Sequence, residues 1–566
     1  MMIRFKTAIA ATLLLSSASV FAQKAPENWF NKDATTDNVN GVSTEKTYKE
    51  ILNGRKSKTV IVAVIDSGVD GEHEDLKDVM WVNPGEIAGN GIDDDQNGYI
   101  DDIHGWNFLG GKDGKNISHE SLELTRLYAR LRAQYGDKKE SEVSNKKEYA
   151  QYLEFKKLVE DKRAEANENL EQMSSTEKLI GDALTLVEKE LGGKAVTAGN
   201  LKAIKAGENQ LLARGLRITQ RFLEQGEIKN MEDVRTELKN QMQEGREHFQ
   251  SMLDYNYNAD FNDRATIVGD NPNDSYENNY GNNDTKGPDP SHGTHVAGII
   301  AASRANGKGM DGIADNVRIM SVRCVPDGDE RDKDVANAII YAVDNGAQVI
   351  NMSFGKGYSW DKQAVDKAVK YAAKHDVLLV HAAGNDSEDN DVSPNFPTAK
   401  FEKAGLFKPK KATTWMEIGA LSWKPGEDLP ATFSNFGKKN VDVFSPGVDI
   451  YSTTPNGTYS SYSGTSMASP VTAGVASMLR SYFPELTAKQ IKEIIESTVI
   501  VSDSMVKKPG GDEKNKVKFS DLSKTGGMVS AYNAAKKAMV TAGKKKDGAY
   551  YKSPLTAGAG TKSVRP

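Results

Sequence analysis

The sequence predicts an α/β fold, a doubly wound and mostly parallel sheet with helices on both faces, together with an α-helical insertion. Three observations lead to this fold class. The run 60–65 is continuously apolar, as in a parallel strand buried on both faces. Two stretches of helical character, HVAGIIAAS and MASPVTAGVASMLR, each begin beside a polar residue. The segment 115–262 contains no proline and carries apolar residues at helical spacing.

The first residues of the chain have the features of a secretory signal. Arg4 and Lys6 precede a short apolar stretch, and small residues precede Gln23. The apolar run is well short of the roughly 20 residues that span a bilayer, and no other segment is a transmembrane candidate. We therefore expect an exported protein that resides in the periplasm, on the cell surface or outside the cell.

The expected organisation follows from changes in composition along the chain. A helix is expected within 41–52, packed on the main domain, and another near 526–539. The predicted parts are a signal peptide at 1–22, an N-terminal extension at 23–58, a first part of the main domain at 59–114, a helical insertion at 115–262, a second part of the main domain at 263–543 and a flexible tail at 544–566.

Three polar residues lie among glycines and other small residues in the order Asp, His, Ser. They are Asp66 in VIVAVIDSGVD, His292 in SHGTHVAG and Ser466 in GTSMASP. Asp66 ends the first apolar strand, at the edge where open α/β sheets bind ligands. A serine hydroxyl becomes a good nucleophile when an imidazole accepts its proton and a carboxylate orients that imidazole. The pattern predicts hydrolytic chemistry with Ser466 as nucleophile, His292 as base and Asp66 as orienting group.

These motifs and their order resemble the subtilisin-like serine peptidases, the subtilases of peptidase family S8. The resemblance covers about residues 58–110 and 265–540 and includes a fourth motif, VLLVHAAGND, which contains Asn385. It implies a subtilisin-like fold, a serine endopeptidase acting on polypeptide substrates, and an oxyanion hole formed by Asn385 and the Ser466 backbone N–H. The second histidine of the His motif, His295, is expected to be structural.

The resemblance also implies a substrate cleft. Ser353, Phe354 and Gly355 match the strand that pairs with an extended peptide. Residues of the fourth motif match the wall of the pocket for the side chain before the scissile bond, namely Ala382, Ala383 and Gly384. The alternative for both segments is that they are ordinary core strands. The residues at the base of the pocket are not identified by this resemblance.

An acidic loop at 89–108 predicts a structural calcium ion. Oxygen-bearing residues recur at alternating positions before Gly98, in the spacing of a calcium loop; the expected ligands are Asp93, Asp95, Asn97 and Asp101. His104 stands where an EF-hand has its final Glu. The pattern therefore favours a calcium loop embedded in the main domain over an EF-hand, and the alternative is a solvated acidic loop.

Asp66 and His292 are separated by 226 positions, far more than in compact subtilases. Within the inserted segment, apolar residues recur along one helical stripe: Leu124, Leu127, Leu131 and Tyr135. Breaks are expected near 174–175, 192–193 and 226, which predicts several helices. The insertion is expected to cap the active site of its own chain, to bind a protein partner, or to serve only as a structural decoration.

Composition excludes some alternatives. The chain has 566 residues, a net charge of −6 and a pI near 5.9, so we expect no nucleic-acid partner. Cys324 is the only cysteine, which excludes an intrachain disulfide. An ester-cleaving hydrolase would carry G-x-S-x-G, whereas Ser466 lies in GTSMA. The remaining alternative is a catalytically idle scaffold that binds a partner through the insertion.

Overall fold

The structure is a computed structural model that describes residues 25–226, 228–403, 409–512 and 514–542. It divides into two compact units, one containing residues 25–123 together with the described residues from 262 onward, and the other containing the described residues of 124–261. The signal peptide predicted at 1–22 and the tail predicted at 544–566 lie outside the described residues. In the described part of the chain, none of the helices has the length and apolar character needed to cross a membrane.

A nine-stranded sheet forms the centre of the first unit. The strand order is β10-β13-β7-β6-β5-β4-β1-β3-β2, and neighbouring strands run parallel except for β10 and β13. The strands are β1 (Val60–Asp66), β2 (Gly105–Asn107), β3 (Val317–Arg323), β4 (Val349–Met352), β5 (Leu378–Ala382), β6 (Trp415–Leu421), β7 (Val443–Pro446), β10 (Ile500–Val501) and β13 (Gly527–Met528). Two small hairpin sheets pair β8 (Ile450–Thr454) with β9 (Thr458–Tyr462), and β11 (Met505–Lys507) with β12 (Lys516–Lys518).

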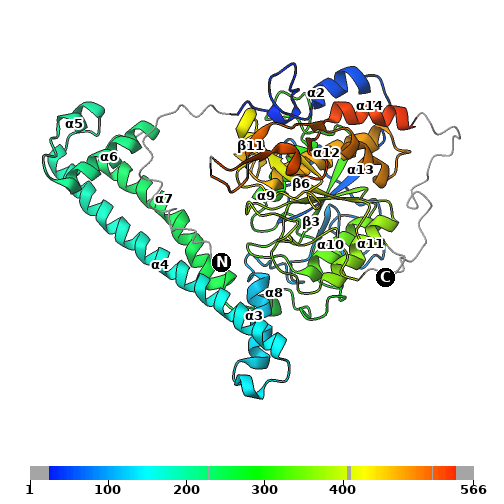
Figure 1. Cartoon of the computed structure of the whole chain (residues 1–566), viewed down its shortest axis with the longest axis horizontal. Helices are drawn as coiled ribbons and strands as arrows, with labels where there is room; N and C mark the ends of the chain where they lie inside the picture. The colour runs from blue at the N-terminus through cyan, green and yellow to red at the C-terminus, as the bar shows by residue number, and fades with distance from the viewer. Residues whose placement is uncertain (1–24, 227, 404–408, 513, 543–566) are drawn as a thin grey trace. The chain divides into compact units, whose positions relative to one another are not determined.

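Helices cover both faces of this sheet, which confirms the predicted α/β class (Figure 1). Val62 and Val64 of β1 face the core that contains α9 (Ser291–Ala301) and α12 (Thr465–Tyr482). Ala63 and Ile65 face the opposite core, against α10 (Asp332–Asp344) and α11 (Lys362–Lys374). The continuous apolar run therefore reflects burial on both sides of the strand. The other helices of this unit are α2 (Thr44–Thr47), α8 (Arg264–Ile267), α13 (Ala488–Ser497) and α14 (Ala531–Ala542).

The helix expected at 41–52 is present as α2 followed by a π-helical turn, Tyr48–Leu52. Val42 and Leu52 join the core on the α9 and α12 face, so this segment packs on the main domain as predicted. The helix expected near 526–539 is α14, and it contacts α2.

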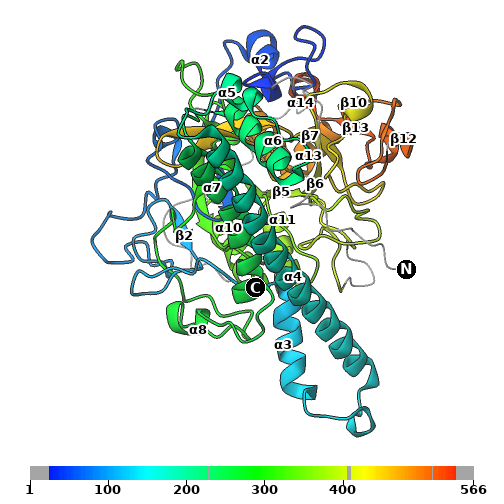
Figure 2. The ribbon, with the colours of Figure 1, turned by 90° about the vertical axis from the view of Figure 1, so that its left-hand side faces the viewer.

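The second unit is helical, as predicted for the insertion (Figure 2). Its helices are α3 (Glu123–Tyr135), α4 (Lys146–Leu191), α5 (Ala198–Ala203), α6 (Gln210–Gln225) and α7 (Met231–Ser251). The long helix α4 packs against α6 and α7, and its buried side chains include Leu184 and Val187. Gly192 ends α4 in the left-handed conformation, at the break expected there.

The break expected at 174–175 is wrong, because α4 continues through both serines. The Ser175 hydroxyl donates to the Glu171 carbonyl at 2.9 Å, four residues earlier. Serine can bond to the preceding turn in this way without interrupting the helix, so its low intrinsic helix propensity is overridden.

Buried charges at the beginning of α10 hold the chain where it returns from the insertion. The Arg264 guanidinium is fully buried and donates to Asp334 at 2.7 Å and to Asp270 at 2.8 Å. The neighbouring Lys333 ammonium donates to Asp270 at 2.5 Å and to Glu277 at 2.7 Å. These charges are paired and hydrogen-bonded inside the protein, as burial of ions requires.

Candidate active site

Asp66 and His292 meet at the carboxyl end of β1. The His292 Nδ1 lies 2.7 Å from the Asp66 Oδ1, and Asp66 is 1% exposed. His292 is the second residue of α9, and Gly293 lets this helix approach the strand. A Cβ at Gly293 would lie 2.1 Å from the Gly68 carbonyl oxygen, closer than any real side chain allows. The glycine after the histidine is therefore a steric requirement of this contact.

The pKa of His292 lies above its ordinary value. Burial acts to lower it, but the negative charge of Asp66, its hydrogen bond and the charge of Asp289 together raise it more. A carboxylate bound at Nδ1 leaves Nε2 of the neutral ring as the proton acceptor. The ring thus has the electronic arrangement of a general base whose protonated form is stabilised.

Two other reactive side chains, those of His295 and Cys324, have structural roles, as predicted for His295. His295 is buried, and its Nε2 bonds to the carbonyls of Ile450 and Ser460 at 2.9 and 3.1 Å. Burial lowers its pKa to about 3, so it stays neutral. Cys324 is fully buried, and burial raises the pKa of its thiol. A thiol held in its protonated form is a poor nucleophile.

Ser466 lies in the first turn of α12, directly after Gly464 and Thr465. Its hydroxyl donates to the Ser353 carbonyl at 3.0 Å, while the Ser353 hydroxyl donates to the Ser466 carbonyl at 2.8 Å. This pair of bonds fixes the start of α12 against the segment that follows β4. The helix N-terminus also directs a positive dipole at the serine.

The Asn385 amide and the Ser466 backbone N–H lie close together beside Gly464. The Asn385 Oδ1 accepts hydrogen bonds from the Thr465 N–H and hydroxyl at 2.9 and 3.0 Å, which fixes the orientation of its amide group. A Cβ placed on Gly464 would lie 3.5 Å from both the Asn385 Nδ2 and the Ser466 N. The glycine therefore leaves open a volume bordered by two N–H donors and located 3.7 Å from the Ser466 Cβ.

The structure brings together the two segments expected to form the substrate cleft. Ser353, Phe354 and Gly355 follow β4, and Ala382, Ala383 and Gly384 follow or end the neighbouring strand β5. Ser353, Ala382 and Ala383 are buried, whereas Phe354 and Gly384 are partly exposed. Both segments therefore lie at the same edge of the sheet as Asp66.

A further residue, Asn395, lies between these segments and was not identified from the sequence. Its Nδ2 donates to the Ala382 carbonyl at 3.0 Å. A Cβ on Gly355 would lie 2.4 Å from the Asn395 amide, and one on Gly384 would lie 3.5 Å from its Cγ. Asn395 thus fills the space between the two expected walls. No local sequence signal marks it, because a loop brings it there.

The acidic loop places its carboxylates differently from the expected calcium set. Asp93 accepts hydrogen bonds from the backbone N–H groups of Asn97 and Gly98 at 3.0 and 2.8 Å. Asp101 accepts from those of Gly89 and Gly91, each at 2.8 Å. These two side chains close turns of the loop, and the Asn97 amide donates to Asp95 and Asp102.

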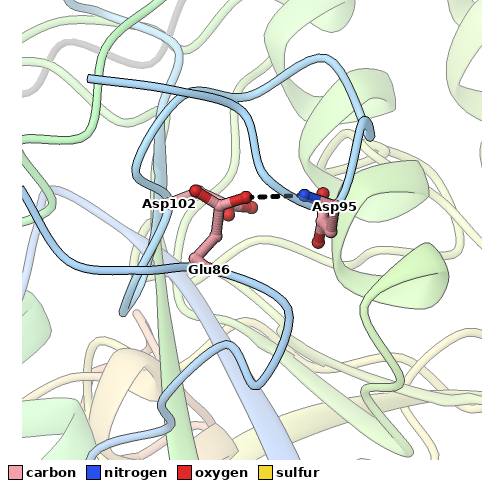
Figure 3. Close-up of side chains that lie close together, drawn as sticks. All are labelled: Glu86, Asp95 and Asp102. Carbon is pink, nitrogen blue, oxygen red and sulfur yellow. Dashed lines mark hydrogen bonds between the residues drawn. The ribbon is translucent and has the colours of Figure 1, made fainter. Parts of the chain in front are cut away.

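Among the described residues, the carboxylates that gather closely enough to share a cation are those of Glu86, Asp95 and Asp102 (Figure 3). One oxygen from each lies within 4.8 Å of the others. Asp102 is fully buried, and burial raises its pKa to about 7 despite hydrogen bonds from Tyr341 and Asn83. Of the four expected ligands, Asp95 is the one that belongs to this group.

The chain is similar to a known protein family and to several known proteins. The family model of the subtilase family matches residues 57–528. The chain is 42% identical over 191 residues to the "Thermophilic serine proteinase" of Bacillus sp. (strain AK1), which covers 34% of this chain and 42% of that protein. It is 35% identical over 219 residues to the "Cell wall-associated protease" of Bacillus subtilis (strain 168), which covers 38% of this chain and 22% of that protein. The chain thus spans less than half the length of these two relatives.

A third relative is covered more fully. "Subtilisin DY" of Bacillus licheniformis is 37% identical over 210 residues, which is 37% of this chain and 69% of that protein. Among solved structures, a protease from Pseudoalteromonas arctica matches with a TM-score of 0.36 and 26% identity, over 45% of this chain and 78% of that one. Because the family model matches residues 57–528, most of the described chain, this protein belongs to the subtilase family.

Proposed function

We propose that this protein is an exported serine endopeptidase that hydrolyses polypeptides through Asp66, His292 and Ser466. The observation that carries the proposal is the 2.7 Å contact between Asp66 and His292, at the same sheet edge as the Ser466 helix terminus. Membership of the subtilase family supports the reaction class. Of the three relatives reported above, one is named a serine proteinase, one a protease and one a subtilisin.

In the proposed reaction, the Ser466 hydroxyl turns from the Ser353 carbonyl toward the His292 Nε2. His292 accepts the hydroxyl proton as Oγ attacks the scissile carbonyl carbon, and Asp66 stabilises the imidazolium. The proton then passes to the leaving amine, which departs as the acyl-serine forms. A water molecule attacks the acyl carbon in the second half, and His292 again accepts and returns a proton.

The Asn385 Nδ2 and the Ser466 N–H would stabilise the oxyanion that forms in each half of the reaction. The position of both nitrogen atoms 3.5 Å from a Cβ placed on Gly464 supports this role. Donors held in place before the reaction are worth several kcal/mol, because they need no reorganisation when charge develops. The Asn385 amide is oriented in advance by Thr465, through its bonds to the Asn385 Oδ1.

We also propose that the acidic loop binds a structural calcium ion through Glu86, Asp95 and Asp102. Carboxylate oxygens are the ligands that calcium prefers. Asp102 is fully buried with a raised pKa, and a bound cation would favour its ionised form. Calcium would stabilise the loop and take no part in the chemistry.

Export is proposed because residues 1–22 have the features of a secretory signal.

For the insertion we propose self-capping of the cleft or binding of a protein partner. The competing function is a catalytically idle scaffold that uses the insertion as its binding surface. The hydrogen-bonded Asp66–His292 pair favours the enzyme, because an idle scaffold has no need of an oriented imidazole.

The test is casein hydrolysis by the purified mature chain, by Ser466→Ala and by the control Ser461→Ala, which changes an exposed serine of β9. We expect Ser466→Ala to abolish hydrolysis and Ser461→Ala to retain it. Each protein is also assayed after chelation and after calcium is returned. Hydrolysis that survives in Ser466→Ala would contradict the assignment, and an inactive wild-type chain would favour the scaffold.

A further inference from the structure

Lys356 follows the expected substrate strand and is buried, with its side chain 0% exposed. Its ammonium donates to the Glu123 carboxylate at 2.7 Å, lies 2.8 Å from the Asp332 Oδ1 and donates to the Glu330 carbonyl at 2.5 Å. The lysine ammonium has three N–H donors, and two of them bind the Glu123 carboxylate and the Glu330 carbonyl. The two carboxylates are also buried, at 1% and 5% side-chain exposure.

The backbone of Lys356 is equally constrained. Its N–H donates to the Phe396 carbonyl at 3.0 Å, and its own carbonyl accepts from the Phe396 N–H at 2.8 Å. Lys356 therefore adjoins Gly355 on one side of the expected pocket and pairs with the residue after Asn395 on the other. Movement of this one residue would displace both segments.

Glu123 connects this lysine to the insertion. It is the first residue of α3, and its backbone N–H donates to Asp329 at 2.7 Å. The helix continues from Glu123 into the inserted segment without interruption. A rotation of its first turn would withdraw a carboxylate from Lys356.

We propose that Lys356 is a positioning residue for the substrate cleft, and that its ion pair with Glu123 couples cleft geometry to the base of the insertion. This inference rests on the proposed function, since it concerns the binding of the polypeptide substrate. Lys356 acts through Gly355 and Phe396, not by contact with the reacting atoms. A displacement of α3 would first affect the binding of substrates that pair with the segment 353–355.

The experiment separates binding in the cleft from the chemistry at Ser466. A peptide substrate with four residues before the scissile bond needs the segment 353–355, whereas a small phosphonyl fluoride needs only a reactive serine. Glu123→Gln keeps the size of the side chain and an oxygen acceptor but removes the charge. Lys356→Arg keeps the charge but changes the geometry of its donors. Both reactions are measured for each variant, with folding checked by thermal unfolding.

The matched control is Asp376→Asn. Asp376 forms an ion pair with Arg480 at 2.9 Å, with side-chain exposures of 20% and 7%. It lies before the beginning of β5, at the opposite end of the strand from Ala382. This variant also loses a shielded ion pair but leaves the cleft intact, so it reports the effect of lower stability alone.

We expect Glu123→Gln to lower kcat/KM for the peptide about 10-fold, mainly through KM, because small displacements of positioning groups have large effects. Phosphonylation should change by less than about threefold. Lys356→Arg should show the same pattern, and Asp376→Asn should leave the ratio of the two rates unchanged. If Glu123→Gln matches Asp376→Asn in both reactions, the positioning role is refuted. If the wild-type chain performs neither reaction, the proposed function itself fails.

Discussion

Replacement of Asn395 by alanine should widen the specificity of the proposed peptidase toward large side chains. The Asn395 amide lies between Gly355 and Gly384, and it is held there by a 3.0 Å hydrogen bond to the Ala382 carbonyl. The substitution removes Cγ, Oδ1 and Nδ2 while Cβ remains. The space between the two expected walls would then accept a longer apolar side chain.

The size of the effect follows from the three atoms removed. Each methylene-sized group of substrate that enters the vacated space gains about 0.8 kcal/mol, so three give roughly 2.4 kcal/mol. This corresponds to an increase of about 50-fold in the preference for Phe over Ala before the scissile bond. Loss of the hydrogen bond to Ala382 should lower the free energy of unfolding by about 1 kcal/mol.

The assay measures kcat/KM for two peptides that differ only in Phe or Ala before the scissile bond. Asn390→Ala is the control, because the Asn390 Nδ2 donates to the neighbouring Ala383 carbonyl at 2.8 Å but is not found between the two glycines. The Phe-to-Ala ratio should rise at least 10-fold in Asn395→Ala, allowing for incomplete use of the new space. An unchanged ratio, or an equal rise in Asn390→Ala, would refute the reasoning.

Four other predictions concern the site, the loop and the insertion. Asn385→Ala should lower kcat about 10²–10³-fold with little change in KM, as loss of one oxyanion donor does in subtilisin; a change confined to KM would contradict the oxyanion role. The proposed base His292 must be neutral to accept a proton, and its pKa is raised above the ordinary value of about 6.5. The acid limb of the pH profile, where kcat/KM falls as the pH is lowered, should therefore have its midpoint above pH 6.5. Asp289→Asn should move that limb to lower pH by less than about 0.7 unit, because one exposed charge is worth under about 1 kcal/mol; a shift upward would refute the sign. Chelation should lower the Tm of the wild-type chain but not that of Asp95→Asn, and an equal response in both would argue against a calcium ion at this carboxylate. Leu184→Ala, in the core of α4, should cost the helical unit about 2–5 kcal/mol and speed hydrogen exchange in α4 and α6; unchanged exchange would contradict that core.

The sequence identified those parts of the site that depend on local structure. Asp66 could be placed at a strand end because the six residues before it are apolar. The fold class and the helical character of the insertion followed from periodicity in the same way. Each of these features is determined within one turn or one strand of the residue concerned.

Features that depend on loop closure could not be predicted. Asn395 reaches the expected pocket because the loop after β5 folds back, and Asn435 helps to hold that loop through the Ala383 carbonyl at 3.0 Å. In the acidic loop, the alternating spacing did not distinguish carboxylates that close turns, such as Asp93, from those that lie close enough to share a cation, such as Asp95. Lys356 resembles a surface lysine in the sequence, because its partner Glu123 is 233 positions away.

The first turn of α10 also explains how this fold accommodates so long an excursion of the chain. Its consecutive residues bind three buried partners: Asp332 pairs with Lys356, Lys333 with Asp270 and Asp334 with Arg264. The segment after the insertion is therefore held by buried charges, and the segment before it is held by the ion pair of Lys356 with Glu123. Each doubling of a flexible loop between fixed ends costs only about 0.6 kcal/mol in closure entropy. During folding, the sheet can therefore assemble before the inserted helices find their own packing. In evolutionary terms, this is a place where chain length can change while the main domain remains intact.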